Sequence, residues 1–298
     1  MARSDADGAP AGILLPQGIR LVATDLDGTL LRADQSVGSR TRRALVALAD
    51  AGIDLVLVTG RPPRWLKPVA VETGHRGTAV GANGAVVVDL AAERVVSVSA
   101  LDPAIAQEAV VRLRRIDPEV HFAVERSRVG DDLDVVRFAL DDGYEPAWPV
   151  PEGTERAPVE ELLAEGDAVK LLARPPEHLA LSPDDFLTAA DELLGPLLEV
   201  THSGATGTLL EMSPAGVDKG SALAAVAADH GIDAAAVVAV GDMPNDLPML
   251  RWAGTSFAVG NAHPAVLDLA GGVLAHHDDE GVADLLEALV RALGPSGL

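Results

Sequence analysis

Two acidic residues follow an apolar run near the start of the chain. Asp25 and Asp27 come directly after Leu21–Thr24, and Gly28 follows them. The run predicts a strand covered on both faces, as parallel sheets require, so the acids stand at its carboxyl end, where ligands bind in open α/β sheets. Two carboxylates that lie close together repel each other, and a divalent cation with oxygen ligands relieves this repulsion. The spacing therefore predicts a metal site where a reacting group would bind.

Other residues capable of chemistry stand at equivalent positions in the chain. They are Thr59-Gly60-Arg61 after the apolar run 53–58, Asn83 after 78–80, Asp242 after 237–240, and Lys219 at the start of a predicted helix 219–230. Strands and helices that alternate with short connections indicate a doubly wound, Rossmann-like parallel sheet, which brings such positions to one edge. The expected fold class is α/β, with Asp25, Thr59, Lys219 and Asp242 in one phosphate and metal site.

A long segment interrupts the alternation. Residues 85–212 predict a hairpin over 85–98, helices over about 103–116 and 183–194, strands over 168–173 and 209–212, and a strand pair around Gly204 and Gly207. The expected organisation is a disordered tail over 1–17, a core made of 18–84 and 213–298, and an inserted α/β cap over 85–212. Ser39 is expected to cap a helix that runs through Ala51, because serine is favoured at helix N-termini.

Composition limits the classes of partner. The chain has 298 residues, enough for two domains, and 23 Lys and Arg against 45 Asp and Glu give a net charge of −22, which disfavours a nucleic-acid partner. With no cysteine, a disulfide framework and thiol catalysis are excluded. No apolar run is long enough for a transmembrane helix, and the tail lacks the pattern of a signal peptide. The expected location is cytoplasmic, without membrane partners.

Four motifs in order give the chain a family resemblance. They are Asp25-Leu26-Asp27-Gly28-Thr29 after a strand, Thr59-Gly60-Arg61 after a strand, Asp218-Lys219-Gly220 before a helix, and Gly241-Asp242-Met243-Pro244-Asn245-Asp246 after a strand. The chain resembles the haloacid dehalogenase superfamily, and its long insertion is similar to the α/β cap of the Cof-type subfamily. The resemblance implies a Mg²⁺-dependent phosphatase of sugar phosphates or similar small phosphomonoesters.

The resemblance also implies roles for individual residues. Asp25 would be the nucleophile that forms an aspartyl phosphate, and Asp27 would be the general acid and base. Asp25, Asp242 and the Asp27 carbonyl would hold Mg²⁺, and Asp246 would act from an outer shell. Thr59 and Lys219 would contact the phosphoryl group. The remaining candidates for substrate contacts are Gly60, Arg61, Asn83 and Asn245.

Two alternatives remain open at this point. A phosphomutase would use the same two acids but retain a bisphosphate intermediate, and a non-catalytic protein would only bind a phosphorylated metabolite. The expected partner is a small phosphorylated metabolite, and the chain would be a monomer or a homodimer.

Several further features are weaker signals. The run His276-His277-Asp278-Asp279 is expected to favour a helix N-terminus and not to bind a metal. His202 and Ser203 are expected to be surface polar residues, whereas some cap residues, Lys170 and Trp148 among them, could face the cleft. The cap is expected to move about hinges near Gly84 and residues 214–216, where glycine permits backbone change.

Overall fold

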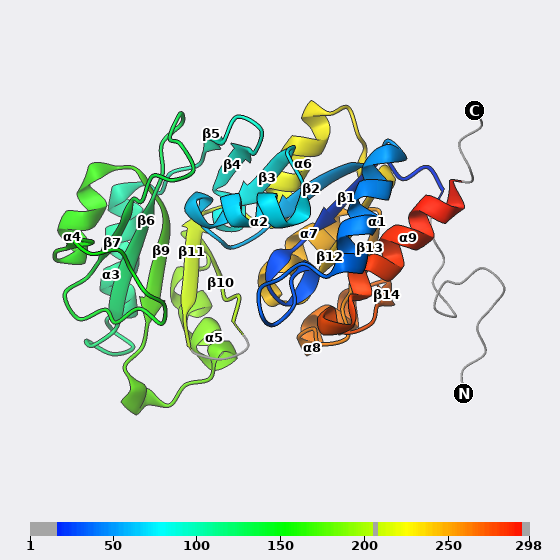
Figure 1. The fold of residues 1–298 in the computed structure, drawn as a ribbon. Coiled ribbons are helices and arrows are strands. Elements are labelled where there is room, and N and C mark those ends of the chain that lie inside the picture. Colours follow the sequence, from blue (N-terminus) through cyan, green and yellow to red (C-terminus); the bar gives the residue numbers. More distant parts are fainter. Residues whose placement is uncertain (1–16, 205–207, 294–298) are drawn as a thin grey trace.

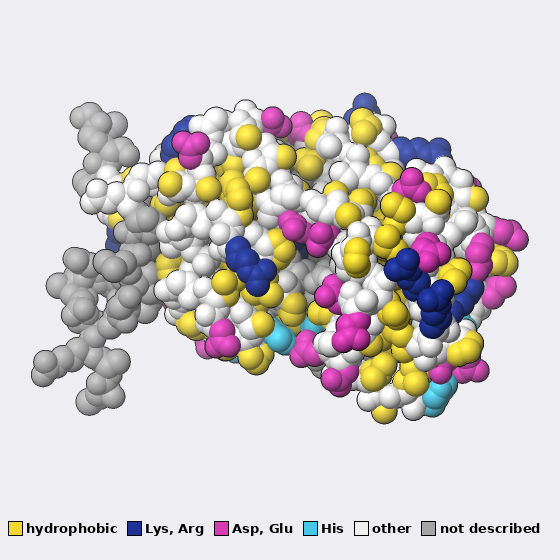
Figure 2. Space-filling model, turned by 180° about the vertical axis from the view of Figure 1, so that it is seen from behind, with side chains coloured by type: hydrophobic (Ala, Val, Ile, Leu, Met, Phe, Trp, Pro, Cys, Tyr) yellow, Lys and Arg dark blue, Asp and Glu magenta, His cyan; other side chains and the backbone are white. Residues whose placement is uncertain are grey.

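The computed structural model describes residues 17–204 and 208–293, which form two lobes, each built on a sheet (Figure 1). The predicted tail over 1–17 lies almost entirely outside the described residues, as does the turn expected around Gly207. Among the helices of the described ranges, none has the length and apolar character to cross a bilayer. On the face shown in Figure 2, basic side chains form small separate groups, and several of these groups have acidic side chains beside them.

The larger lobe contains an eight-stranded sheet in the order β14-β13-β12-β1-β2-β3-β4-β5. Its strands are β1 (Leu21–Thr24), β2 (Asp54–Val58), β3 (Thr78–Gly81), β4 (Val86–Asp89), β5 (Arg94–Val98), β12 (Val237–Gly241), β13 (Thr255–Ala258) and β14 (Gly272–Val273). Neighbouring strands from β14 to β3 are parallel. Every residue of β1 and β12 is buried, as expected for central strands covered on both faces. The predicted doubly wound α/β core is confirmed.

Helices cover both faces of this sheet (Figure 1). They are α1 (Ser39–Asp50), α2 (Leu66–Thr73), α6 (Lys219–Asp229), α7 (Leu247–Trp252), α8 (Pro264–Leu269) and α9 (Gly281–Ala292). α1 packs against α9, and α6 packs against α7. The expected Ser39 cap is wrong, because Gly38 is the N-cap residue and makes no side-chain bond. Glu280, just before α9, instead accepts hydrogen bonds from the backbone N–H and the hydroxyl of Thr41, at 2.8 and 2.9 Å.

The smaller lobe contains a six-stranded sheet in the order β10-β11-β9-β6-β7-β8. Its elements are β6 (His121–Arg126), β7 (Phe138–Leu140), β8 (Glu155–Arg156), β9 (Ala168–Arg174), β10 (Leu198–Thr201) and β11 (Leu210–Pro214), with the helices α3 (Pro103–Leu113), α4 (Val159–Leu162) and α5 (Pro183–Leu194). α3 and α5 pack against each other. Side chains of the strands alternate between this helical layer and the face toward the larger lobe.

The hairpin over 85–98 lies elsewhere than expected. β4 pairs antiparallel with β3, and β5 pairs with β4, so both strands extend the sheet of the larger lobe. Val86, Val88 and Val95 are buried in the core of that lobe. The hairpin, expected in the cap, therefore belongs to the core sheet by its hydrogen bonds and by its packing.

Candidate active site

Three carboxylates and one ammonium meet at the carboxyl edge of the core sheet. Asp25 follows β1, and Asp242 and Asp246 follow β12. Lys219, the first residue of α6, is buried and donates hydrogen bonds to Asp25 at 2.6 Å and to Asp246 at 2.5 Å. One carboxylate oxygen from each of the three acids lies within 4.8 Å of the other two. The structure thus brings together residues that are up to 221 positions apart in a chain of 298.

The backbone around Asp25 is shaped to admit Asp242. Gly28 has a φ of +74°, and a Cβ atom at this position would lie 2.4 Å from an oxygen of the Asp242 carboxylate. The next residue, Thr29, donates a hydrogen bond from its hydroxyl to Asp242 at 2.8 Å. Glycine is required here both by the left-handed backbone and by the close approach.

Asp246 fixes the loop that carries Asp242. One of its carboxylate oxygens accepts hydrogen bonds from the backbone N–H groups of Asp242 and Met243, at 2.8 and 3.0 Å. Its other oxygen accepts the bond from Lys219. Asp246 is fully buried, so it orients both the loop and the lysine from behind.

The charges of this cluster are unbalanced. Burial raises the pKa of Asp25 well above its usual value, and Asp246 and Asp242 add to this effect while Lys219 opposes it. Burial and the nearby Asp246 raise the pKa of Asp242 to about 7. Burial acts to lower the pKa of Lys219, but the carboxylates of Asp246 and Asp25 outweigh it and raise the pKa above its usual value. A further positive charge would therefore be stabilised here, and the oxygen donors suit a hard divalent cation.

Asp27 is held by an arginine. Arg61 donates two hydrogen bonds from its guanidinium to the Asp27 carboxylate, at 2.7 and 2.6 Å, and a third to Gln35. The side-chain hydroxyl of Thr59 accepts a hydrogen bond from the backbone N–H of Arg61 at 3.1 Å. Arg61, predicted to contact substrate, contacts the predicted general acid in this structure.

The predicted residues Asn83 and Asn245 lie in a hydrogen-bonded chain that reaches the cap. Asn245 donates to the side-chain oxygen of Asn83 at 3.1 Å, and Asn83 donates to Glu211 of β11 at 2.9 Å. Lys170 of β9 donates to Glu211 at 2.5 Å and to the backbone carbonyl of Gly60 at 2.7 Å. The cap is thus bonded to the loop that follows β2.

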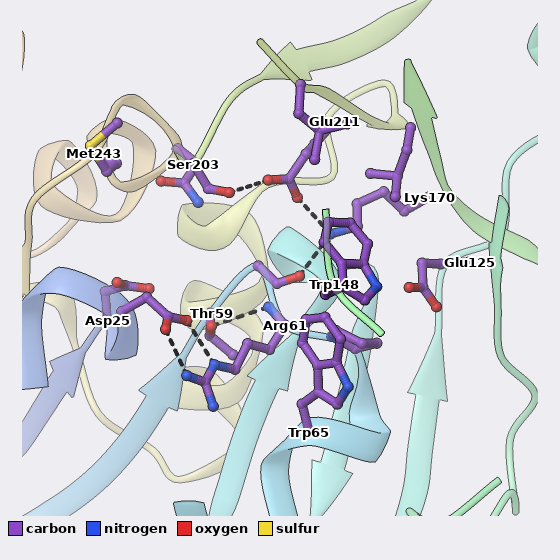
Figure 3. A pocket seen from close by; sticks show the side chains of 16 residues that line it. Asp25, Thr59, Arg61, Trp65, Glu125, Trp148, Lys170, Ser203, Glu211 and Met243 are labelled. Carbon is purple, nitrogen blue, oxygen red and sulfur yellow. Dashed lines mark hydrogen bonds and ion pairs between the residues drawn. The ribbon is translucent and has the colours of Figure 1, made fainter. Parts of the chain in front are cut away.

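A cavity of about 180 Å³ lies between the two lobes (Figure 3). The core lines one end of it and the cap lines the other. Its walls include Asp25, Asp27, Thr59, Gly60, Arg61, Trp65, Asn245 and Met243 from the core, and Glu125, Trp148, Lys170, Leu172, Ser203, Leu209 and Glu211 from the cap. The predicted nucleophile Asp25, the predicted general acid Asp27 and residues 59–61 therefore face the same cavity.

Sequence reasoning missed Trp65, Glu125 and Glu211 as cavity residues. A signal was present for Glu211, because it is a charged residue between two apolar residues of a strand. Glu211 stands between Leu210 and Met212, which are buried in the cap core. Because successive side chains of a strand point to opposite faces of the sheet, Glu211 points away from the cap core and toward the cavity.

The two weaker signals also have places in the structure. Ser203 is exposed, as expected, but it also lines the cavity and donates a hydrogen bond to Glu211. The expectation of a surface residue is wrong for His202, which is buried and has its Nε2 atom 2.9 Å from a carboxylate oxygen of Asp184. His276, His277 and Asp278 bring possible ligand atoms together at the surface, ahead of α9.

Comparison with known proteins agrees with the motifs. Residues 22–286 match the model of the haloacid dehalogenase-like hydrolase family. The chain belongs to this family. It is 29% identical to a phosphoglycolate phosphatase from Methanopyrus kandleri, covering 91% of this chain and 97% of the relative. It is 26% identical to the 5-amino-6-(5-phospho-D-ribitylamino)uracil phosphatase YwtE of Bacillus subtilis, covering 91% and 98%.

The fold has solved counterparts. A haloacid dehalogenase-like hydrolase from B. subtilis superimposes with a TM-score of 0.73 over 90% of this chain and 99% of the other, at 23% identity. This likeness supports the fold. The family model confirms the family assignment expected from the motifs, and the chain is an enzyme of this hydrolase family.

Proposed function

We propose that this hydrolase is a Mg²⁺-dependent phosphatase of small phosphomonoesters, such as sugar phosphates and related metabolites, that acts through an aspartyl phosphate. The observation that carries the proposal is the position of Asp25. It is a buried carboxylate, bonded to Lys219 and beside two further acids, and it lines the cavity between the lobes. A carboxylate with this arrangement is suited to covalent catalysis of phosphoryl transfer. The phosphatase names of its relatives support the same reaction.

In the first half of the reaction, one bond to phosphorus would form and another would break. An oxygen of Asp25 attacks the phosphorus atom, and the bond from phosphorus to the ester oxygen breaks. Asp27, which lines the cavity, gives a proton to the departing oxygen after it has taken up that proton and its bonds from Arg61 have opened, because the paired carboxylate has no proton to give. Lys219 neutralises Asp25 beside the phosphoryl group, and the Thr59 hydroxyl can donate to one of the phosphoryl oxygens.

The second half would release phosphate. Asp27, now deprotonated, accepts a proton from a water molecule that attacks the phosphorus atom, and the bond from phosphorus to Asp25 breaks. The residues that would hold Mg²⁺ are Asp25 and Asp242, through carboxylate oxygens, and Asp27, through its carbonyl, with Asp246 behind them. Bound Mg²⁺ would neutralise the carboxylates and the phosphoryl oxygens.

The experiment that tests this proposal measures release of inorganic phosphate. The purified chain is incubated with sugar phosphates, polyol phosphates, nucleotides and 4-nitrophenyl phosphate, in Mg²⁺ and in excess chelator. We expect turnover of several small phosphomonoesters in Mg²⁺ and its loss in chelator, with Asp25→Asn as the inactive control. Full activity in chelator, or in the Asp25→Asn variant, would contradict the mechanism.

A further inference from the structure

The cap end of the cavity contains two ion pairs. Glu125 of β6 and Glu211 of β11 both line the cavity. Glu125 is paired with Arg64, and Glu211 is paired with Lys170. All four side chains are largely buried, with exposed fractions of 11% for Arg64 and 5% or less for the other three. The charge at this end is therefore internally balanced before any substrate binds.

Arg64 lies behind Glu125 and not in the cavity wall. Its two terminal nitrogens donate to the two oxygens of Glu125, at 2.6 and 2.7 Å. Its guanidinium carbon lies 5.2 Å from the ring centres of both Trp65 and Phe138. Such a fork-to-fork bond with rings on the guanidinium fixes the arginine in place, so it presents Glu125, and not its own charge, to the cavity.

Lys170 lines the cavity, but its ammonium is already bonded. It donates to Glu211 at 2.5 Å and to the Gly60 carbonyl at 2.7 Å, which uses two of its three donors. Glu211 also accepts bonds from Asn83 and Ser203. Burial acts to raise the pKa of Glu211, but Lys170 and these hydrogen bonds outweigh it and hold the pKa below its usual value, so the carboxylate stays ionised.

The other basic residue that lines the cavity lies at the core end. Arg61 is paired with Asp27, beside the phosphoryl site. Among the described residues that line the cavity, each lysine or arginine is thus matched by a carboxylate. The space that a leaving group would occupy has two carboxylates, Glu125 and Glu211, and an apolar side made by Trp148, Leu172 and Leu209. Trp148 is supported edge-on by Trp65, with ring centres 5.7 Å apart.

We propose that this cavity selects monophosphates whose leaving group carries no charge, and that it discriminates against substrates with a second anionic group. A carboxylate or second phosphate on the leaving group would lose water and would face Glu125 and Glu211 without a free cation. Hydroxyl groups would instead donate to the open lone pairs of these carboxylates, while a carbon face packs on Trp148. This inference rests on the proposed phosphatase function and narrows its substrate class.

The test uses pairs of substrates that differ only in this charge. The first pair is glycerol 3-phosphate and 3-phosphoglycerate, and the second is sorbitol 6-phosphate and 6-phosphogluconate; in each pair a CH₂OH group is replaced by a carboxylate. We expect kcat/KM of the wild-type enzyme to be at least about tenfold higher for the substrate with the CH₂OH group. The carboxylate of the other substrate would be repelled by Glu125 and Glu211, which weakens its binding. Equal or higher kcat/KM for the anionic members would overturn the inference.

A variant tests whether the pairing of Arg64 is the cause. Glu125→Gln keeps the shape of the side chain but frees the guanidinium charge, so the preference for the uncharged member should fall by about tenfold. The double variant Arg64→Gln/Glu125→Gln removes both charges and should keep the wild-type preference. Glu72→Gln breaks the exposed pair with Arg42 and is the matched control, with no change expected.

The failure of this inference is distinct from failure of the proposed function. If the wild-type enzyme releases phosphate from no member of either pair and from no other phosphomonoester, the proposed function fails. If it turns over the anionic members as well as the uncharged ones, only the charge selection fails. A Glu125→Gln variant that does not fold leaves the wild-type comparison to decide.

Discussion

Replacement of Lys219 by methionine should destabilise the core lobe strongly. Lys219 is only 1% exposed and bonds two carboxylates, Asp25 and Asp246, whose side chains are 7% and 0% exposed. Methionine has a similar length but no charge, so both acids would remain buried without their cation. Removal of one partner from a buried ion pair typically costs about 3–5 kcal/mol. That loss is a large fraction of the roughly 5–15 kcal/mol by which domains are stable.

Urea unfolding followed by circular dichroism measures this loss. We expect the Lys219→Met midpoint to fall far below that of wild type in chelator, and to recover partly in Mg²⁺, because a bound cation would replace some of the missing charge. Lys67→Met is the matched control. Lys67 also pairs with two carboxylates, Glu93 and Asp134, but all three side chains are exposed, and exposed pairs contribute little.

A Lys219→Met midpoint within error of wild type in chelator would refute this reasoning. It would mean that the three acids of the cluster tolerate burial without the lysine, either because they are protonated in the folded chain or because water reaches them. Repeating the measurement at lower pH separates these cases. If protonation compensates, the variant becomes more stable relative to wild type as the pH falls, because the raised pKa of Asp25 favours its neutral form in the folded state.

Four other variants test the site and the scaffold. Asp25→Asn should abolish phosphate release while urea unfolding stays cooperative, and near wild-type turnover would contradict a covalent mechanism. Asp27→Asn should slow alkyl phosphates more than 4-nitrophenyl phosphate, whose leaving group needs less protonation; equal slowing would count against the acid role. Asp242→Ala should raise the Mg²⁺ concentration for half-maximal activity, and an unchanged Mg²⁺ titration would exclude it as a ligand. Glu280→Gln should lower the free energy of urea unfolding by about 1 kcal/mol near neutral pH, as loss of a helix cap does, because Glu280 accepts a hydrogen bond from the first turn of α1. Burial acts to raise the pKa of Glu280, but bonds from Thr41 and Arg32 hold it below its usual value. The stability that the Glu280 carboxylate contributes is therefore present above the usual pKa of glutamate and is lost as the pH falls through the lowered pKa of the folded state. A loss of stability in Glu280→Gln that persists in acid would contradict this role.

The core cluster could be predicted from the sequence because a parallel sheet imposes its geometry. An apolar strand followed by a polar residue fixes where that residue lies, and crossover helices leave little freedom in how strands are ordered. Asp25, Lys219 and Asp242 were expected at one edge, and the structure places them there. The Asp27–Arg61 pair was not expected, because a side chain on a loop can turn to more than one partner.

The cap resisted prediction because its contacts depend on pairing between distant segments. The sequence indicates that 85–98 is a hairpin, but not that β3 is its neighbour, since an edge strand of either sheet could accept it. Likewise Glu125 and Lys170 are neighbours across β6 and β9, yet each pairs with a residue on another element. Charge patterns within one strand cannot reveal such partners.

The position of the hairpin changes where the chain crosses between the lobes. Gly84, near which a hinge was expected, lies within the core, and a Cβ atom there would lie 2.2 Å from the Asp218 carbonyl oxygen. The chain leaves the core later. Ser99 still bonds to Ala85 of the core, whereas Leu101 bonds to Ala168 of the cap.

The return crossing lies between Pro214, which pairs with Leu198 in the cap sheet, and Asp218, which caps α6. Two short crossings, at 99–101 and 214–218, therefore connect the lobes. Between these crossings, side-chain hydrogen bonds hold the two lobes together at the cavity, chiefly from Lys170 to the Gly60 carbonyl and from Arg64 to Glu125. Opening the cap would break these bonds but need not disturb either sheet. A substrate would then enter before the cap closes on it, and closure would bring Glu125, Glu211 and Trp148 to its leaving group while excluding water from the phosphoryl site.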